Sequence, residues 1–392
     1  MCRYLLLIAL VGCGGGGAAD DDDDVPTPDA PPTSECPREP AAADRTRYVV
    51  VARPYDTEGM SAPKFEVLEL SATGTLTQFD PPRLFDLGAR TPFGVIAFTP
   101  DGKIGLVAMD NGDLGVFSLD DSGNPTVIHA SFDGAFYGSR VVMDPSGDRA
   151  WVIDENTREN GGGIYRVDIN CDGTLTDGGQ VAAARSPGGL AFAGDHAVLA
   201  ARDLLDSPAG DNLHLIDLVD GVRLGGGDAF GMGEQSFSGF AVSADGGLAL
   251  IGDSNFAGPN RVAVAKLSAT GATKISVIPN ITDPSAIAIS PAGDVAIVSS
   301  SQPPGEGIYV LDANGPGGTW QNLGELTYDG DPAQLPGDMT VITRGALAGN
   351  VLVSELSTIR RVVFTATGAE DAGSLTFGEG LDSIGGAIGV TP

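Results

Sequence analysis

The sequence predicts an all-β protein, a seven-bladed β-propeller in which the N-terminal and C-terminal strands share one blade. A pattern of short strands recurs about every 45 to 53 residues, which is a period typical of propeller blades. The units at 93–109 and 286–298 each contain two apolar strands around a tight turn. This turn recurs at 99–102, 144–147, 243–246 and 290–293, and its last residue is always a glycine, which supplies a positive φ.

The first residues predict export and lipid attachment. Residues 1–12 contain one arginine and then an apolar run too short to span a bilayer, as in a cleaved signal peptide. The sequence Leu10-Val-Gly-Cys13 resembles the bacterial lipobox, which makes Cys13 the lipidated first residue of the mature protein. The alternative is a plain signal peptide with an incidental cysteine. Several acyl chains on one residue would hold the protein stably on a membrane.

Residues 13–47 are expected to be a disordered tether, followed by the propeller at 48–392. The tether combines glycines, five consecutive aspartates and a proline-rich stretch, with almost nothing to bury. The aspartates keep the tether solvated or, alternatively, act as a sorting or surface-display signal. Gly14, directly after the lipidated cysteine, favours the outer membrane. We therefore expect an outer-membrane lipoprotein of the bacterial cell envelope that faces the periplasm or the cell surface.

Two cysteines remain for a disulfide. Cys2 leaves with the signal peptide and Cys13 carries the lipid, so Cys36 and Cys171 are the thiols left in an oxidising compartment. The roughly 12 residues between Cys36 and the first strand reach about 40 Å when extended. The chain length permits a bond between these two cysteines without requiring it.

The blades follow one another from residue 48 onward. Strands are expected at 48–52, 64–70 and 76–79, and this first group lacks an opening strand. The other groups begin near Phe93, Ser139, Gly188, Ser238, Pro284 and Asp338. The final segment, 384–392, has the pattern of an opening strand with no second strand after it, so it completes the first group. An open solenoid would leave both ends unpaired.

The inner strands of a propeller crowd around its axis, and small residues at those positions are interpreted as packing. They are Gly94, Ala97, Ala191, Ala241, Ala288 and Gly389. The chain shows no long helical periodicity, and its 57 glycines and 26 prolines fit a chain made mainly of turns.

The charge of the chain excludes one class of partner. The 52 acidic and 22 basic residues give a net charge of −30. Of these, nine acids and four bases precede residue 48, so the propeller itself is acidic, with 43 acids and 18 bases. This balance argues against nucleic acid and against direct adsorption to anionic lipid. Cationic partners and metal ions remain compatible with it.

The blade pattern resembles the seven-bladed lactonase-like and YVTN-repeat propellers. The turn at 99–102 with the strand Leu106-Val-Ala-Met-Asp110, and the turn at 290–293 with the strand 295–298, carry the resemblance over most of residues 48–392. The resemblance implies the fold. It does not imply an activity, because the family includes sugar lactonases and many proteins without a known reaction, and no matched set of catalytic residues is found here.

Acidic residues recur where the second strand of a blade ends. Five or six of the seven blades carry one, and these positions form a predicted ligand-binding rim on the face that commonly binds ligands. The functional interpretation is an acidic funnel for a cation, a metal or a basic peptide. The alternative is that aspartate simply ends strands and forms turns. The residues are Asp56, Asp110, Asp154, Asp203, Asp253 and Glu355.

One hairpin resembles the first half of a calcium loop. Asp168, Asn170 and Asp172 alternate along the chain and precede a glycine, as the oxygen ligands of Ca²⁺ do in such loops. The match fails at position twelve, where Gly179 replaces a bidentate glutamate. Calcium is therefore one hypothesis for this site, and a simple hairpin turn is the other.

Motifs of enzymes are scarce. The chain has no Gly-x-Ser-x-Gly elbow, no phosphate loop and no Cys-x-x-Cys, and the histidines His129, His196 and His214 fit structural or solvated positions. We expect a monomeric, lipid-anchored binding or interaction module with a protein or small molecule on one propeller face and no nucleic acid. The alternatives are a metal-dependent lactonase-like hydrolase whose rim carboxylates hold the metal, and a purely structural envelope protein.

Overall fold

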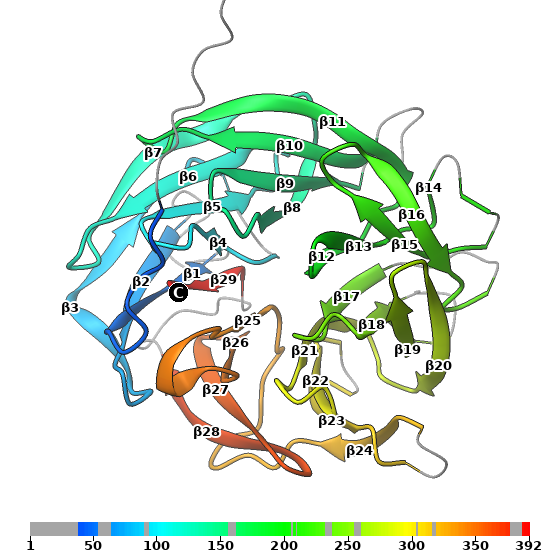
Figure 1. Cartoon of the computed structure of the whole chain (residues 1–392). Helices are drawn as coiled ribbons and strands as arrows, with labels where there is room; N and C mark the ends of the chain where they lie inside the picture. Colours follow the sequence, from blue (N-terminus) through cyan, green and yellow to red (C-terminus); the bar gives the residue numbers. More distant parts are fainter. Residues whose placement is uncertain are drawn as a thin grey trace, which may run out of the picture. The chain divides into compact units, whose positions relative to one another are not determined.

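The computed structural model of the chain is a β-propeller, as the sequence predicts (Figure 1). It describes residues 38–53, 64–89, 94–155, 162–204, 207–208, 210–231, 237–254, 260–302, 305–315, 319–376 and 386–392. Within these residues the strands form seven antiparallel groups of four around a central axis. We number them as blades 1 to 7, beginning with the blade that the two ends of the chain share.

Each blade runs from an inner strand at the axis to an outer strand at the rim. Blade 1 consists of β29 (Ile388–Val390), β1 (Arg47–Arg53), β2 (Lys64–Leu70) and β3 (Leu76–Phe85). Blade 2 consists of β4 (Ala97–Phe98), β5 (Ile104–Ala108), β6 (Leu114–Leu119) and β7 (Pro125–Phe132). Blade 3 consists of β8 (Gly138–Met143), β9 (Arg149–Asp154), β10 (Gly163–Ile169) and β11 (Leu175–Arg185), and the short β14 (Asp203–Leu204) pairs with the end of β11.

The remaining blades repeat this arrangement. Blade 4 consists of β12 (Gly189–Ala193), β13 (His196–Ala200), β15 (Leu213–Asp217) and β16 (Val222–Gly227). Blade 5 consists of β17 (Phe237–Val242), β18 (Leu248–Asp253), β19 (Arg261–Ser268) and β20 (Gly271–Pro279). Blade 6 consists of β21 (Pro284–Ile289), β22 (Val295–Ser300), β23 (Gly307–Asp312) and β24 (Gln321–Glu325). Blade 7 consists of β25 (Met339–Val341), β26 (Val351–Glu355), β27 (Thr358–Thr365) and β28 (Gly368–Thr376).

The C-terminal strand closes the ring, which confirms the expected join. β29 pairs antiparallel with β1, so that Val49 faces Val390 and Val51 faces Ile388. Next to the ladder, Thr391 accepts a hydrogen bond from the Tyr48 amide through its Oγ1, at 2.9 Å. Closure in this way leaves the inner edge of β1 covered, and an uncovered edge would be a template for aggregation.

Glycines explain one feature that the sequence pattern did not predict, the joining of blades 4 and 5 into one eight-stranded sheet. The outer strands β16 and β20 meet in a single parallel pair, Gly226 with Gly271. A Cβ atom on Gly225 or Gly227 would lie 2.2 or 2.1 Å from a backbone oxygen of residues 270–272. The glycine run in β16 therefore lets the two outer strands approach each other.

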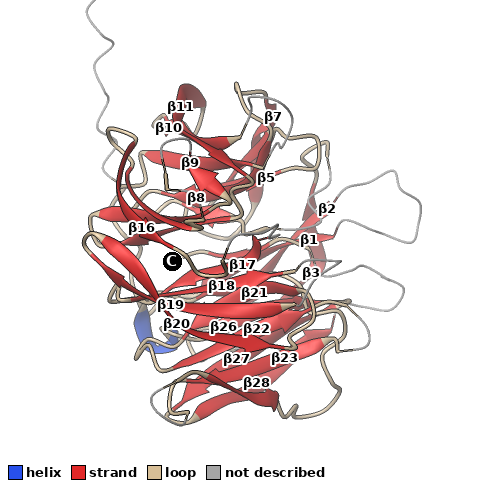
Figure 2. Cartoon of the chain, turned by 90° about the vertical axis from the view of Figure 1, so that its right-hand side faces the viewer, coloured by secondary structure: helices blue, strands red, loops and turns tan. Residues whose placement is uncertain are grey.

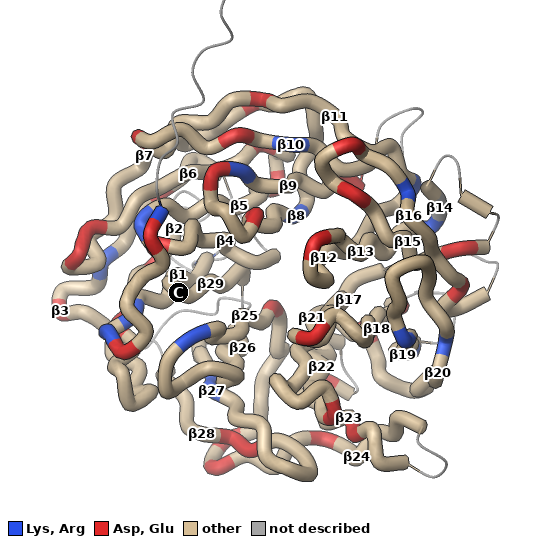
Figure 3. The backbone as a smooth tube through the Cα atoms, viewed as in Figure 1, with Lys and Arg blue, Asp and Glu red and all other residues tan. Residues whose placement is uncertain are grey.

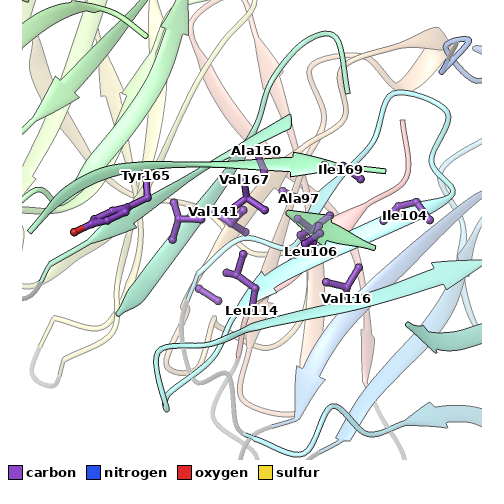
Figure 4. Packing of buried hydrophobic residues seen from close by; sticks show 13 residues of the cluster. Ala97, Ile104, Leu106, Leu114, Val116, Val141, Ala150, Tyr165, Val167 and Ile169 are labelled. Carbon is purple, nitrogen blue, oxygen red and sulfur yellow. The ribbon is translucent and has the colours of Figure 1, made fainter. Parts of the chain in front are cut away.

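The core consists of apolar layers between adjacent blades. Figure 4 shows one such layer, where Leu106 and Val116 of blade 2 face Val141 and Val167 of blade 3. All four side chains are buried, and three of them are fully so. Alternation along each strand places one set of side chains against each neighbouring blade, so burial of apolar area holds the ring together from both sides.

The repeated turns have the structure that their sequence predicts. Gly102, Gly147, Gly246 and Gly293 have φ between +70° and +76°. In the turn at 99–102, the Thr99 hydroxyl donates to the Asp101 carboxylate at 2.6 Å and accepts the Ile104 amide at 3.1 Å. These side-chain bonds fix the step from the inner to the second strand.

Residues 38–47 lie along the face of the propeller that carries these turns. The Ala41 amide donates to the Pro100 carbonyl at 3.0 Å, and the Arg38 guanidinium donates to the Asn170 carbonyl at 2.9 Å. Figure 2 shows the molecule from the side, with strands throughout and a single described helical turn, η1 (Gly345–Leu347). Among the described residues, no helix is long and apolar enough to cross a bilayer.

Candidate functional site

A cavity of about 540 Å³ lies at the mouth of the central channel, on the face opposite the one that carries the repeated turns. Its wall is formed by residues at the starts of inner strands and at the ends of second strands, contributed by blades 2, 3, 5, 6 and 7. The volume is within the usual range for a small-molecule site. Such a cavity draws its functional groups from blades that are far apart in sequence, so no local motif describes it.

Arg140 provides the positive charge of this cavity. It belongs to the inner strand β8, and it is the only lysine or arginine among the described lining residues. Its Nε atom lies 3.8 Å from a carboxylate oxygen of Glu155, and the Arg140 side chain is 26% exposed. The guanidinium is thus accessible from the cavity but partly neutralised by a neighbour.

Asp338 is a buried acid in the wall of the same cavity. It precedes β25, and only 4% of its surface is exposed. Burial raises the pKa of its carboxyl to about 6, although Arg140 and a hydrogen bond from Gly94 oppose the shift. The Gly94 amide donates to Asp338 Oδ2 at 2.6 Å, and Gly94 has a φ of +116°. Gly94 was expected only to pack at the crowded axis, but its backbone conformation also directs its amide toward Asp338.

Hydroxyl groups and a further carboxylate also belong to the polar wall. Ser301 donates its hydroxyl to Asp283 at 2.6 Å, and Ser285 shares a hydrogen bond with Ser299 at 3.0 Å. Asp283 and Leu335 both line the cavity and both have positive φ, 43° and 46°. Positive φ in residues other than glycine is strained and concentrates at functional sites.

An aromatic side chain borders the cavity next to these polar groups. Tyr137 is 49% exposed, and its hydroxyl donates to the Asp110 carbonyl at 2.6 Å. The ring is therefore fixed in place while part of its surface stays open. An exposed and oriented ring of this kind can contact the apolar face of a ligand.

Two of the predicted rim acids lie at or beside the cavity. Asp110 is exposed and lines it. Asp154 is 3% exposed, and its carboxylate accepts the Tyr137 amide at 3.1 Å. Asp154 thus supports the loop that carries Tyr137 and does not present a free carboxylate to a ligand.

The other rim acids that the structure describes are not brought together at the channel. Asp253 is fully buried in an ion pair with Arg261 at 3.1 Å, and Glu355 is buried against Arg360 at 2.6 Å. The backbone of Asp203 pairs with Arg185 of the outer strand β11, far from the inner strands of the ring. Asp56 lies outside the described residues. Figure 3 shows acidic residues scattered around the whole ring.

The predicted calcium hairpin is held by its own side chains. Asp168 lies 3.3 Å from Arg166, Asn170 donates its amide to Thr174, and Asp172 accepts from Thr174. In the described part of the chain, no three His, Cys, Asp or Glu side chains are grouped so that they could hold a metal ion. These contacts are those of a hairpin turn, and calcium binding at this hairpin stays a prediction.

Cys171, in the same hairpin, is disulfide-bonded. Its partner lies outside the described residues, as do Cys13 and Cys36, so the bond to Cys36 and the lipid on Cys13 stay predictions. The hairpin is also where Arg38 binds, through the Asn170 carbonyl. The chain just after Cys36 is thus held next to Cys171.

Sequence reasoning missed most of the cavity wall, although a signal was present. Ser139, Ser238 and Asp338 mark the starts of three blades, and all three line the cavity. A polar residue recurring at the start of an inner strand is the pattern that would have pointed to them. The histidines expected to be structural or solvated do not line this cavity.

Comparisons with known proteins support the fold. No protein-family model matches the chain, and no curated protein matches its sequence. A candidate 6-phosphogluconolactonase from Bacteroides fragilis superposes with a TM-score of 0.61 at 14% identity, covering 90% of this chain and 100% of that one. The periplasmic gluconolactonase of Pseudomonas aeruginosa gives a TM-score of 0.57 at 14% identity, over 88% of this chain and 99% of that one. A hypothetical selenium-binding protein from Sulfolobus tokodaii gives 0.63 at 12% identity, over 90% and 94%.

Proposed function

We propose that this propeller binds a small, uncharged, hydroxyl-rich molecule of the sugar type in the cavity at the channel mouth. The observation that carries the proposal is the composition of the wall. Carboxylates of Asp110 and Asp283 can accept hydrogen bonds from ligand hydroxyls, and Arg140 can donate to a ligand oxygen. The exposed ring of Tyr137 offers a surface for the apolar face of a sugar ring.

The charges of the wall argue against a phosphorylated or strongly anionic ligand. Arg140 is the one cationic side chain among the described lining residues, and Glu155 lies 3.8 Å from it. Three further acids share the cavity with this pair. A phosphate group would lose its hydration without gaining the several donors that phosphate sites provide.

Calorimetric titration of the full-length protein tests this proposal. The ligands are monosaccharides, their methyl glycosides and 6-phosphogluconate. We expect the neutral sugars to bind and the phosphorylated acid to bind at least tenfold more weakly.

Tyr137→Ala and Asp283→Asn should each weaken sugar binding about tenfold, which corresponds to the loss of one good contact. Asp120→Asn, in an exposed hairpin on the opposite face, serves as the control. Equal binding by all three variants, or stronger binding of the phosphorylated acid, would contradict the proposal.

A second function, hydrolysis of a lactone, is favoured by the presence of Asp338 and Arg140 in the wall of one cavity, where the charge of Arg140 acts on the Asp338 carboxyl. The Arg140 guanidinium would polarise the lactone carbonyl, and ionised Asp338 would accept a proton from the attacking water. The water oxygen then bonds to the carbonyl carbon, the ring C–O bond breaks, and the leaving oxygen takes up a proton to form the hydroxy acid. The gluconolactonases with this fold make sugar lactones a natural first substrate to test.

Release of acid from glucono-1,5-lactone, followed at constant pH, tests hydrolysis. Asp338→Asn should lower the rate at least a hundredfold, because general base catalysis contributes about 10² to 10⁴. The rate should rise as the pH passes about 6, where Asp338 ionises. A metal-dependent reaction would instead be abolished by a chelator and restored by a divalent cation. A rate equal to the spontaneous rate would leave binding as the function.

We further propose that the protein is an outer-membrane lipoprotein anchored through Cys13. The first described residues, from Arg38 onward, contact the face opposite the cavity. Metabolic labelling with a fatty acid tests the anchor: Cys13→Ser should lose the label, whereas Cys171→Ser should keep it. Fractionation of the envelope then tests the expected outer-membrane location. Label retained in Cys13→Ser would exclude this anchor.

A further inference from the structure

A second cavity, of about 230 Å³, lies deeper in the channel and meets the first cavity at Arg140, which lines both. Its ten lining residues come from blades 2, 3, 4 and 5. Arg140 has the only polar side chain among them. The rest of the wall includes Val95, Val142, Met143, Leu190 and Phe240.

The wall of this inner cavity combines a close contact with an exposed apolar side chain. Gly189 has no side chain at the position where the Phe240 ring packs, since a Cβ there would lie 2.3 Å from the Phe240 Cβ. Val95, two residues before β4, keeps 39% of its surface exposed even though it stands at the centre of the molecule. A solvent-exposed valine inside an apolar channel loses dispersion contacts that an apolar ligand would restore.

The size and polarity of the inner cavity select what can fill it. An apolar cavity of roughly 150 Å³ stays dry and takes up benzene. The inner cavity exceeds this volume and is open to solvent, and Arg140 is the one polar side chain in its wall, so water in it has few side-chain partners and an apolar group can displace that water. An aliphatic group of about six carbons is of the size that fits.

We infer that the ligand is an alkylated sugar-type molecule, whose hydroxylated part lies in the outer cavity and whose short aliphatic arm passes Arg140 into the inner cavity. This inference rests on the proposed binding of a hydroxyl-rich molecule and names its apolar part. The aliphatic stem of Arg140 borders the passage, and its guanidinium faces the carboxylate of Glu155. The hydroxyl groups of the ligand would then contact the polar wall of the outer cavity, and its aliphatic arm would contact the apolar wall of the inner cavity.

The test is a series of β-D-glucopyranosides with methyl, butyl, hexyl and octyl groups, below their micelle concentrations, titrated into the full-length protein. Each buried methylene should raise the affinity about fourfold. The gain should end near the hexyl group, where the inner cavity is full. Val95→Phe should remove the gain and leave methyl glucoside binding intact, because the larger side chain occupies the inner cavity.

Val341→Phe is the matched control. Val341 lies on the inner strand β25 and is 36% exposed, but it lines neither cavity. The inference is overturned if affinity does not depend on chain length, or if the two variants lose the gain equally. Methyl glucoside that fails to bind would count against the proposed function alone. Titration with 1-hexanol then tests the inner cavity by itself, and no hexanol binding, or equal binding to wild type and Val95→Phe, would overturn the inference.

Discussion

Arg360 in blade 7 shows how a buried charge is accommodated in this fold. Its guanidinium pairs with Glu355 at 2.6 Å, with Asp371, and with the Asp331 carbonyl at 2.9 Å. The side chains of the three ions are at most 3% exposed. Burial raises the pKa of Glu355, and hydrogen bonding and attraction to Arg360 oppose that shift. Arg360 is thus the cation that both buried acids contact.

Replacing this arginine should therefore cost much more than breaking an exposed pair. Arg360→Met leaves two buried carboxylates without their cation and should lower the free energy of unfolding by about 3 to 5 kcal/mol. Arg149→Met breaks a pair whose side chains are 32% and 50% exposed, and should cost at most about 1 kcal/mol. Urea unfolding of both variants measures their free energies of unfolding. Similar losses in the two variants would contradict the conclusion that Arg360 compensates the buried charge of Glu355.

The same contact explains why the acidic rim was not predictable from sequence. Glu355 and Asp253 do end second strands, as the pattern indicated, but each meets an arginine near the start of the next strand. Arg261 is the direct cross-strand partner of Asp253. Whether an acid at that position faces the channel or an arginine depends on the hairpin register and on side-chain orientation, which the spacing of acids along the chain does not specify.

At the scale of elements, the strand order was predictable because each blade repeats one pattern with its own turn. The expected starts near Ser139, Gly188, Ser238 and Pro284 lie within a residue of the observed starts of β8, β12, β17 and β21. Phe93 itself lies outside the described residues, and the described strand that follows it, β4, begins at Ala97 and is only two residues long. Pairing between blades 4 and 5 was not predicted, because it depends on how closely two outer strands approach in space.

Gly389 tests the closure of the ring. It pairs with Val50 in the short ladder between β29 and β1, and a Cβ atom there would lie 2.2 Å from the Ile96 carbonyl oxygen. Gly389→Ala should lower the free energy of unfolding by at least about 2 kcal/mol, because backbone atoms on both sides would have to move. Gly368→Ala, whose nearest contact would be an ordinary 3.9 Å, should change it by no more than about 0.5 kcal/mol. Thermal and urea unfolding measure the stability of the two variants. An equal loss of stability would mean that the close approach of Gly389 to Ile96 does not restrict the side chain at position 389.

At the scale of the whole molecule, two buried groups act on stability in opposite directions as the pH changes. Burial, reinforced by Arg223, lowers the pKa of His214 in blade 4 to about 4, and burial raises the pKa of Asp338 to about 6. Between pH 4 and 6.5 the folded state binds fewer protons at His214 than the unfolded state, so this residue destabilises the fold as the pH falls. Between pH 4 and 6 the folded state binds more protons at Asp338, so this residue destabilises the fold as the pH rises.

Each group would change stability by about 3 kcal/mol across its range if it acted alone, since one pKa unit corresponds to about 1.4 kcal/mol. The two effects oppose each other over the same range, so substitutions should separate them. Asp338→Asn keeps an acceptor for the Gly94 amide and should be more stable than wild type at pH 7, by an amount that vanishes near pH 4. His214→Leu should show the reverse, with its advantage over wild type larger at pH 4 than at pH 7. Urea unfolding of the three proteins from pH 4 to 7.5 measures both differences. Because the profiles are compared as differences from wild type, the common titration of the surface acids cancels. Parallel profiles would mean that neither buried group changes its protonation on folding.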